Sequence, residues 1–143
     1  MFRKVFLFCA LVLTMASGSA MAAQKISVAS DCTWPPMEFL DENKQPIGFS
    51  VDLLREMGKE LGVEFDIKNV PWDGIFSGVA AGKYQMVSSS TTITEERLKK
   101  YLFSDPYYVE GQAVLIRTED LDTYTTAESL SGCTVGAQKG TVQ

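Results

Sequence analysis

The residues best suited to chemistry in this chain are a run of hydroxyl side chains followed by an arginine. Residues 88–92 are all serine or threonine, and Arg97 follows where the pattern predicts the start of a helix. Hydroxyls and unpaired backbone N–H groups at a helix N-terminus bind anions, and an arginine fork adds a bidentate, permanently charged partner. This segment is therefore suited to holding a carboxylate.

The same segment also has a purely structural interpretation. Thr92 with Glu95 three residues later fits a capping box, and Thr94 could cap the helix as well. A catalytic interpretation is disfavoured, because the chain contains no histidine and a Ser–His pair is impossible. Hydroxyls without a base favour binding over turnover, so we expect no catalytic residues.

The N-terminal residues predict export. Arg3 and Lys4 precede an apolar stretch over residues 5–15, and small residues then lead to Ala20-Met21-Ala22, the cleavage pattern of a secretory signal peptide. The apolar stretch is shorter than the roughly 20 residues that a membrane span needs. We expect residues 1–23 to be removed and the mature protein to be periplasmic.

Composition excludes several kinds of partner. Signal removal takes two of 13 basic residues and none of 18 acidic ones, so the net charge changes from −5 to −7. Such a chain lacks the basic surface that nucleic acids require. With no histidine and no Cys-x-x-Cys pair, we expect no metal and no cofactor. Cys32 and Cys133 are expected as free thiols, and a disulfide between them stays open as an alternative.

Alternating strand and helix patterns place the candidate residues. Residues 26–29 alternate as a strand, and two prolines then turn residues 31–36 into a loop that carries Trp34. Helix patterns at 49–61, 72–81 and 95–101 alternate with strand patterns at 63–70, 86–87 and 112–117. This order predicts an α/β fold with a mainly parallel sheet and helices on both faces.

The predicted strand ends favour the carboxylate interpretation. Ligands of open parallel sheets bind beyond the carboxyl ends of the strands. The Trp34 loop and the hydroxyl run both follow such ends. Trp72, by contrast, is expected in the core, because it shares a helix face with Ile75 and Phe76.

Five motifs, in order along residues 25–143, carry a resemblance to a known family. They are Pro36-Met37-Glu38-Phe39, Gly48-Phe49-Ser50-Val51-Asp52-Leu53-Leu54, Pro71-Trp72-Asp73-Gly74, Thr92-Ile93-Thr94-Glu95-Glu96-Arg97 and Phe103-Ser104-Asp105-Pro106-Tyr107-Tyr108. With them the sequence resembles the family 3 extracellular solute-binding proteins, the periplasmic amino-acid receptors of ABC importers. The resemblance implies a type II periplasmic-binding-protein-like fold. Residues 24–117 would form its first lobe with the hinge strand, and residues 118–143 the truncated start of a second lobe.

The resemblance also implies roles for individual residues. The expected ligand-binding residues are Asp31, Trp34, Ser89, Ser90, Thr92, Arg97 and Thr141. Trp34 would stack on the ligand side chain, and the three hydroxyl residues would meet its ammonium and carboxylate. Arg97 would clamp the carboxylate, and Thr141 would offer it a backbone N–H.

The leading hypothesis is a monomeric receptor that binds a polar or charged L-amino acid and delivers it to an ABC permease in the inner membrane. A cyclohexadienyl or arogenate dehydratase-like enzyme, with Arg97 holding a substrate carboxylate, and a sensor domain of a signalling receptor are the alternatives. One lobe leaves a bound zwitterion open to water on one side, where charge pairing is screened. We therefore expect this chain alone to bind free amino acids very weakly, and residues 118–143 to be poorly ordered.

Overall fold

The computed structural model describes residues 23–142, and its central element is strand β1 (Gln24–Ser30). Strand β5 (Val63–Asn69) pairs with β1 on one side and strand β6 (Met86–Val87) pairs with it on the other. Both pairings are parallel, which confirms the predicted sheet. The predicted signal peptide lies outside the described residues except for Ala23.

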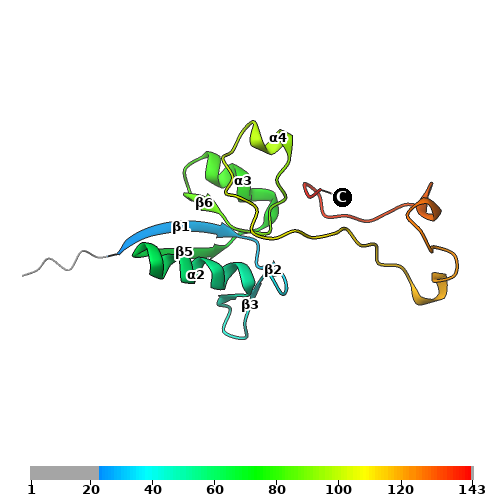
Figure 1. Ribbon diagram of the computed structural model, residues 1–143, viewed down its shortest axis with the longest axis horizontal. Helices are drawn as coiled ribbons and strands as arrows, with labels where there is room; N and C mark the ends of the chain where they lie inside the picture. Colours follow the sequence, from blue (N-terminus) through cyan, green and yellow to red (C-terminus); the bar gives the residue numbers. More distant parts are fainter. Residues whose placement is uncertain (1–22, 143) are drawn as a thin grey trace, which may run out of the picture.

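Helices cover both faces of this sheet (Figure 1). Helix α2 (Phe49–Leu61) packs on β5, whereas helix α3 (Trp72–Ala80) packs on β1 and β6. Neighbouring residues of a strand point to opposite faces, and Val28 and Ala29 of β1 are both fully buried. The two-sided covering predicted for a parallel sheet is therefore confirmed.

The helix ends follow from local chemistry. Gly62 ends α2 in the left-handed region, at φ +66°, and donates its N–H to the Gly58 carbonyl, as its position predicted. Helix α4 (Glu95–Leu98) is shorter than predicted and begins at Thr94, whose hydroxyl accepts from the Arg97 N–H at 3.2 Å. The capping box of Thr92 with Glu95 is therefore wrong, and the alternative cap is confirmed.

Helix α3 contributes the core beside β1. Its buried residues Trp72 and Ile75 pack with Ala29 and Val70. The expectation that Trp72 belongs to the core is confirmed. A second, antiparallel sheet follows β1 and holds strands β2 (Thr33–Trp34), β3 (Glu38–Leu40) and β4 (Pro46–Ile47) in that order. Short two-residue strands such as β2 carry too few residues to show a period, and the sequence predicted only a loop here.

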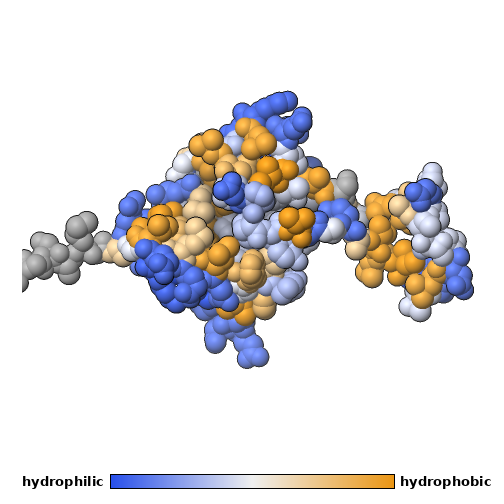
Figure 2. All heavy atoms as spheres, in the orientation of Figure 1, coloured by the Kyte–Doolittle hydropathy of each residue, from blue (hydrophilic) through white to orange (hydrophobic). Residues whose placement is uncertain are grey.

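The predicted strand at 112–117 is wrong. Residues 101–117 form neither helix nor strand, and in Figure 1 they leave the sheet as an extended segment. A strand needs a partner for its backbone groups, and none of the described residues pairs with this segment. Leu102, Val109 and Leu115 are consequently almost fully exposed, and Figure 2 shows apolar atoms where the chain extends from the body.

The remaining residues make two single turns and then return. Turns η2 (Thr118–Asp120) and η3 (Glu128–Leu130) are short 3-10 helices, and the chain end lies back near α3 and α4 in Figure 1. Cys32 is buried, Cys133 is exposed and both are free thiols, as expected. No helix among residues 23–142 has the length and apolar character needed to cross a membrane.

Candidate functional site

Arg97 is the positively charged centre of the candidate site. The cap at Thr94 places it in the first turn of α4, where its guanidinium lies 5.6 Å from the Trp72 ring centroid and 5.2 Å from that of Phe76. Its Nη1 donates to the Thr92 carbonyl at 2.8 Å, and its Nη2 donates to the Gly140 carbonyl at 3.0 Å. A guanidinium has further N–H donors, so this arrangement leaves capacity for a carboxylate.

The three predicted hydroxyl residues have different surroundings. Ser89 is buried, and its Oγ accepts from the backbone N–H of Asp31 at 2.9 Å. Ser90 is partly buried, has φ +40° and donates its hydroxyl to Glu38 Oε2 at 3.0 Å. Thr92 is exposed. Of these three side chains, one is hydrogen-bonded to the residue that follows β1, one is hydrogen-bonded to β3 and one is open to solvent.

Six of the seven predicted binding residues line one cavity of about 1030 Å³. They are Trp34, Ser89, Ser90, Thr92, Arg97 and Thr141. Trp34 is 41% exposed, so its indole offers a face to a ligand. Thr141 comes from the returning chain end, where its Oγ1 donates to the Gln138 carbonyl at 2.6 Å. The site thus combines residues from the body and from the chain end, and their role in binding stays a prediction.

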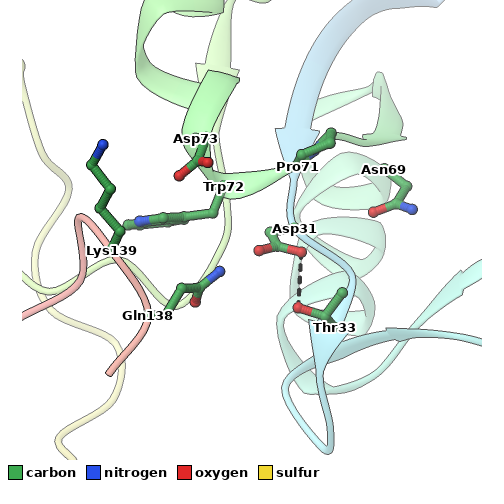
Figure 3. A pocket seen from close by; sticks show the side chains of 8 residues that line it. All are labelled: Asp31, Thr33, Asn69, Pro71, Trp72, Asp73, Gln138 and Lys139. Atoms are coloured by element: carbon green, nitrogen blue, oxygen red, sulfur yellow. Dashed lines mark hydrogen bonds between the residues drawn. The ribbon is translucent and has the colours of Figure 1, made fainter. Parts of the chain in front are cut away.

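The seventh residue, Asp31, lines an adjacent cavity of about 400 Å³. It is 4% exposed, and its Oδ1 accepts from Thr33 Oγ1 at 2.9 Å. Figure 3 shows the Asp31 and Asp73 carboxylates beside the Trp72 indole, with Gln138 and Lys139 of the chain end nearby. Trp72 lines both cavities and so connects Asp31 with the other six residues.

Sequence reasoning missed two residues of this site. Trp72 was assigned to the core alone, but it also borders both cavities and lies under Arg97. Its position just after the end of β5 was a usable signal, because ligands bind at that edge of a parallel sheet. Glu38 was quoted only within a motif, although an acidic residue amid apolar neighbours is a signal by itself.

Glu38 is fully buried without an ionic partner. None of the ion pairs among residues 23–142 includes it. Burial raises the pKa of its carboxyl, the Ser90 and Ser50 hydroxyls act in the opposite direction, and the charges of Asp31 and Glu110 raise it further. Its Oε1 makes no hydrogen bond of good geometry within the described residues.

The chemistry of the whole set suits a small zwitterion. Arg97 and the hydroxyls line one cavity, Asp31 lines the adjacent cavity, and the Trp72 indole borders both. Within residues 23–142, no group of three or more His, Cys, Asp or Glu side chains could hold a metal ion. The set therefore offers a cationic group and an acidic group to a ligand.

The sequence of this chain also matches a known protein family. The model of the bacterial extracellular solute-binding proteins, family 3, matches residues 26–131. This match covers more than half of the chain. The chain belongs to this family. The resemblance seen in the five sequence motifs is therefore confirmed.

The relatives of this family 3 protein include several curated binding proteins from Escherichia coli. The L-cystine-binding protein TcyJ of strain K12 is 35% identical over 114 residues, covering 80% of this chain and 43% of the relative. ABC transporter arginine-binding protein 1 is 35% identical over 138 residues, covering 96% and 55%. The histidine-binding periplasmic protein is 31% identical over 144 residues, covering 99% and 55%. The chain spans about half the length of these relatives.

Solved structures give the same fold. The ancestral amino acid-binding protein AncCDT-1, a precursor of cyclohexadienyl dehydratase, matches with a TM-score of 0.69 at 40% identity, over 74% of this chain and 47% of that one. The arginine-bound form of domain 1 from TmArgBP matches with a TM-score of 0.56 at 42% identity, over 59% of this chain and 67% of that one. The family 3 protein thus has part of a type II periplasmic-binding-protein fold, as predicted.

Proposed function

We propose that the protein is the periplasmic substrate-binding component of an ABC importer and binds a polar or charged L-amino acid through its carboxylate and ammonium. The observation that carries this proposal is the Arg97 guanidinium, held at the start of α4 over two aromatic rings and beside the hydroxyl-lined cavity. A carboxylate there would accept charge-assisted hydrogen bonds from the Arg97 guanidinium, whose orientation is already fixed by its contacts. Delivery to an inner-membrane permease, action as a monomer and export by the N-terminal signal belong to the same proposal.

A cationic side chain is the finer part of the proposal. Asp31 is buried, lies beside Asp73 and the Trp72 indole, and takes part in none of the ion pairs among residues 23–142. A guanidinium or ammonium there would meet an unpaired carboxylate and an aromatic face. Relatives named for arginine and histidine are consistent with this chemistry. We take L-arginine as the first ligand to test.

Binding by this chain alone is also part of the proposal, which revises our sequence-based expectation of very weak binding. The arginine-bound form of domain 1 from TmArgBP shows that a separate domain of a relative can hold arginine. Here Arg97, Asp31 and Trp72, which supply the charges and the indole, all lie outside residues 118–142, and the chain end adds the Gly140 carbonyl that accepts from Arg97. We therefore propose a measurable affinity.

Calorimetric titration of the mature chain tests the proposal. The ligands are L-arginine, L-histidine, L-cystine, L-glutamine and agmatine, which is arginine without its carboxylate. We expect L-arginine to bind and agmatine to bind at least about tenfold more weakly, because it cannot use Arg97. Agmatine binding as tightly as L-arginine would contradict the carboxylate clamp.

The matched variants are Arg97→Ala and Arg97→Lys. Removing one partner of a desolvated charge pair costs roughly 2–5 kcal/mol, so Arg97→Ala should abolish measurable binding of L-arginine. Lysine keeps the charge but lacks the planar fork, so we expect only partial recovery. Affinities of wild type and Arg97→Ala within about threefold of each other would exclude the clamp.

The enzymatic alternative has no support from individual residues. The curated relatives compared above are named as binding proteins, and AncCDT-1 is itself described as an amino acid-binding protein. We propose binding without turnover.

A further inference from the structure

We propose that Glu38 is a positioning residue that fixes the direction of the Ser90 hydroxyl, so that Ser90 accepts a hydrogen bond from the ligand's ammonium. This inference rests on the amino-acid-binding function proposed above. Glu38 does not line the ligand cavity and acts only through Ser90. The sequence left open whether Ser90 contacts the ammonium or the carboxylate of the ligand, and the inference assigns it to the ammonium.

The geometry of the Glu38–Ser90 pair carries the first step. Glu38 lies in β3, opposite Trp34 of β2, and its side chain is fully buried. Ser90 donates its hydroxyl to Glu38 Oε2 at 3.0 Å and lines the large cavity. A serine hydroxyl has a single proton, so once this proton is given to Glu38 the oxygen can only accept from the cavity side. Only a donor, such as an ammonium, satisfies such an oxygen.

The backbone of Ser90 carries the second step. Ser90 has φ +40°, and the only other non-glycine residue with a positive φ among those described is Lys44. Residues with L side chains populate this region sparsely, and they persist there when the surroundings determine their conformation. The hydrogen bond to Glu38 ties this unusual backbone to the buried strand. Ser90 therefore has both its backbone and its hydroxyl direction specified.

The charges around Glu38 carry the third step. The charged groups that act on it are Asp31 from the end of β1 and Glu110 from the extended segment, and both are acidic. The Ser50 hydroxyl approaches from α2, and Cys32, which follows β1, contributes a neutral thiol. A buried carboxylate in such surroundings favours a cation in the adjoining cavity. The cavity thus has the Arg97 cation in its lining and the buried Glu38 carboxyl hydrogen-bonded to Ser90 of the lining, and both charges would act on a bound zwitterion.

The direction of the hydrogen bond between Ser90 and Glu38 can be tested without any ligand. If Glu38 were protonated and donated to Ser90, the serine proton would point to the cavity and would meet a carboxylate. We would measure the Glu38 pKa from the ¹³C shift of its carboxyl carbon in the mature wild-type chain and in Ser90→Ala. Loss of a hydrogen bond to the ionised form should raise this pKa by about one pH unit.

Ser88→Ala, from the same hydroxyl run, is the control and should leave the Glu38 pKa unchanged. An unchanged or lowered Glu38 pKa in Ser90→Ala would overturn the positioning role. A lowered value in particular would mean that Ser90 accepts from the protonated carboxyl.

Ligand affinity tests the consequence for recognition. Wild type, Glu38→Ala, Glu38→Gln and Ser90→Ala would be titrated with L-arginine and with 5-guanidinopentanoic acid, which lacks only the α-ammonium. Glu38→Ala and Ser90→Ala should bind L-arginine about tenfold more weakly and leave the affinity for the desamino ligand within about twofold. Glu38→Gln keeps an acceptor oxygen and should restore part of the affinity, without the pH dependence of wild type.

The outcomes separate the two proposals. Equal losses for both ligands would show that Glu38 only maintains structure, and would overturn its role in ammonium recognition. A wild-type chain that binds none of the amino acids would overturn the proposed function and this recognition role together. If the chain binds L-arginine but the Glu38 pKa is the same in wild type and Ser90→Ala, only the positioning role would be overturned.

Discussion

At the scale of single residues, Asp31 is the side chain to which we assign the selection of ligands by charge. It is 4% exposed, and its backbone N–H and one carboxylate oxygen are held by Ser89 and Thr33. No basic residue among those described forms an ion pair with it. Its charge is therefore available to a cationic ligand, and the surrounding hydrogen bonds keep it in place.

Asp31→Asn should therefore weaken the binding of a cationic amino acid more than the binding of a neutral one. We expect L-arginine to bind at least about tenfold more weakly, because an amide lacks the charge, while L-glutamine affinity stays within about threefold. Asp73→Asn is the matched control, and we expect a smaller effect because Asp73 is exposed. Calorimetry with both ligands measures the ratio. Equal losses of affinity for the two ligands in Asp31→Asn would show that the Asp31 carboxylate does not recognise the charge of the ligand's side chain.

Residue identities could be predicted from the sequence better than residue partners. The run at 88–92 and Arg97 were recognisable because few residue types bind a carboxylate. The partner of Ser89 is Asp31, just after β1, and the partner of Ser90 is Glu38 of β3. Both lie more than fifty positions away, and no local pattern encodes them. Glu38 was missed for the same reason, since its importance depends on full burial, which a motif does not show.

At the scale of elements, helix α3 carries two glycines in contrasting surroundings. A Cβ at Gly74 would meet nothing within 4 Å, whereas a Cβ at Gly78 would lie 2.8 Å from the Tyr84 ring. Tyr84 packs against the core cluster that includes Ile75. Substituting alanine at Gly74 therefore tests helix propensity alone, whereas alanine at Gly78 also tests packing against Tyr84.

Gly74→Ala should stabilise the fold and Gly78→Ala should not. Alanine is favoured over glycine in a helix by up to about 1 kcal/mol, and Gly74→Ala should raise the free energy of unfolding by part of that amount. Gly78→Ala has the same preference but must displace the Tyr84 ring, so we expect a net loss. Urea unfolding of both variants measures the difference. A stabilised Gly78→Ala would show that the Tyr84 ring moves at negligible cost.

Elements with strong local signals were predicted well. The thirteen residues of α2 were bounded correctly, because its apolar spacing and Gly62 agree. The predicted strand at 112–117 failed because its apolar residues specify burial without specifying a neighbour, and the described chain gives them none. Helix α4 begins at Glu95 as predicted but ends at Leu98 instead of Tyr101, because residues 99–100 leave the helix as a turn.

At the scale of the whole molecule, Glu38 makes stability depend on pH. Burial is the main cause that raises its folded pKa above the ordinary value of 4.5. Between those two pKa values the folded state keeps a proton that the unfolded chain has lost. Its contribution to stability is therefore fully present below pH 4.5 and is lost as pH rises through the raised folded value.

Glu38→Gln should remove this dependence, because glutamine stays neutral at every pH. We expect the difference in free energy of unfolding between Glu38→Gln and wild type to shift in favour of the variant as pH rises from about 4 to 8. Denaturant unfolding at several pH values measures it, with the exposed Glu42→Gln as control. Parallel curves for Glu38→Gln and wild type would contradict the raised pKa of this carboxyl.

The fold of the whole molecule could be predicted because its order of strands and helices is local in sequence. Strand β5 directly follows helix α2 and strand β6 follows helix α3, so the alternation of helix and strand indicates the parallel sheet. The family resemblance placed Thr141 beside the same carboxylate as Arg97, but the hydrogen bond through which residues 138–141 return to Arg97 could not be predicted from the residues themselves. It depends on a carbonyl of Gly140, and backbone carbonyls carry no sequence signal.

That return has a consequence for the entropy of binding. Arg97 is stacked between aromatic contacts and two carbonyls, so its rotamer is chosen during folding. Immobilising a free arginine side chain costs up to about 2 kcal/mol in lost rotamer freedom. Because folding already immobilises Arg97, ligand binding should lose little of this free energy. The fork is preorganised. We therefore expect Phe76 and Gly140 to affect affinity indirectly, because loosening either one would restore motion to Arg97 and weaken the proposed carboxylate binding without removing a ligand contact.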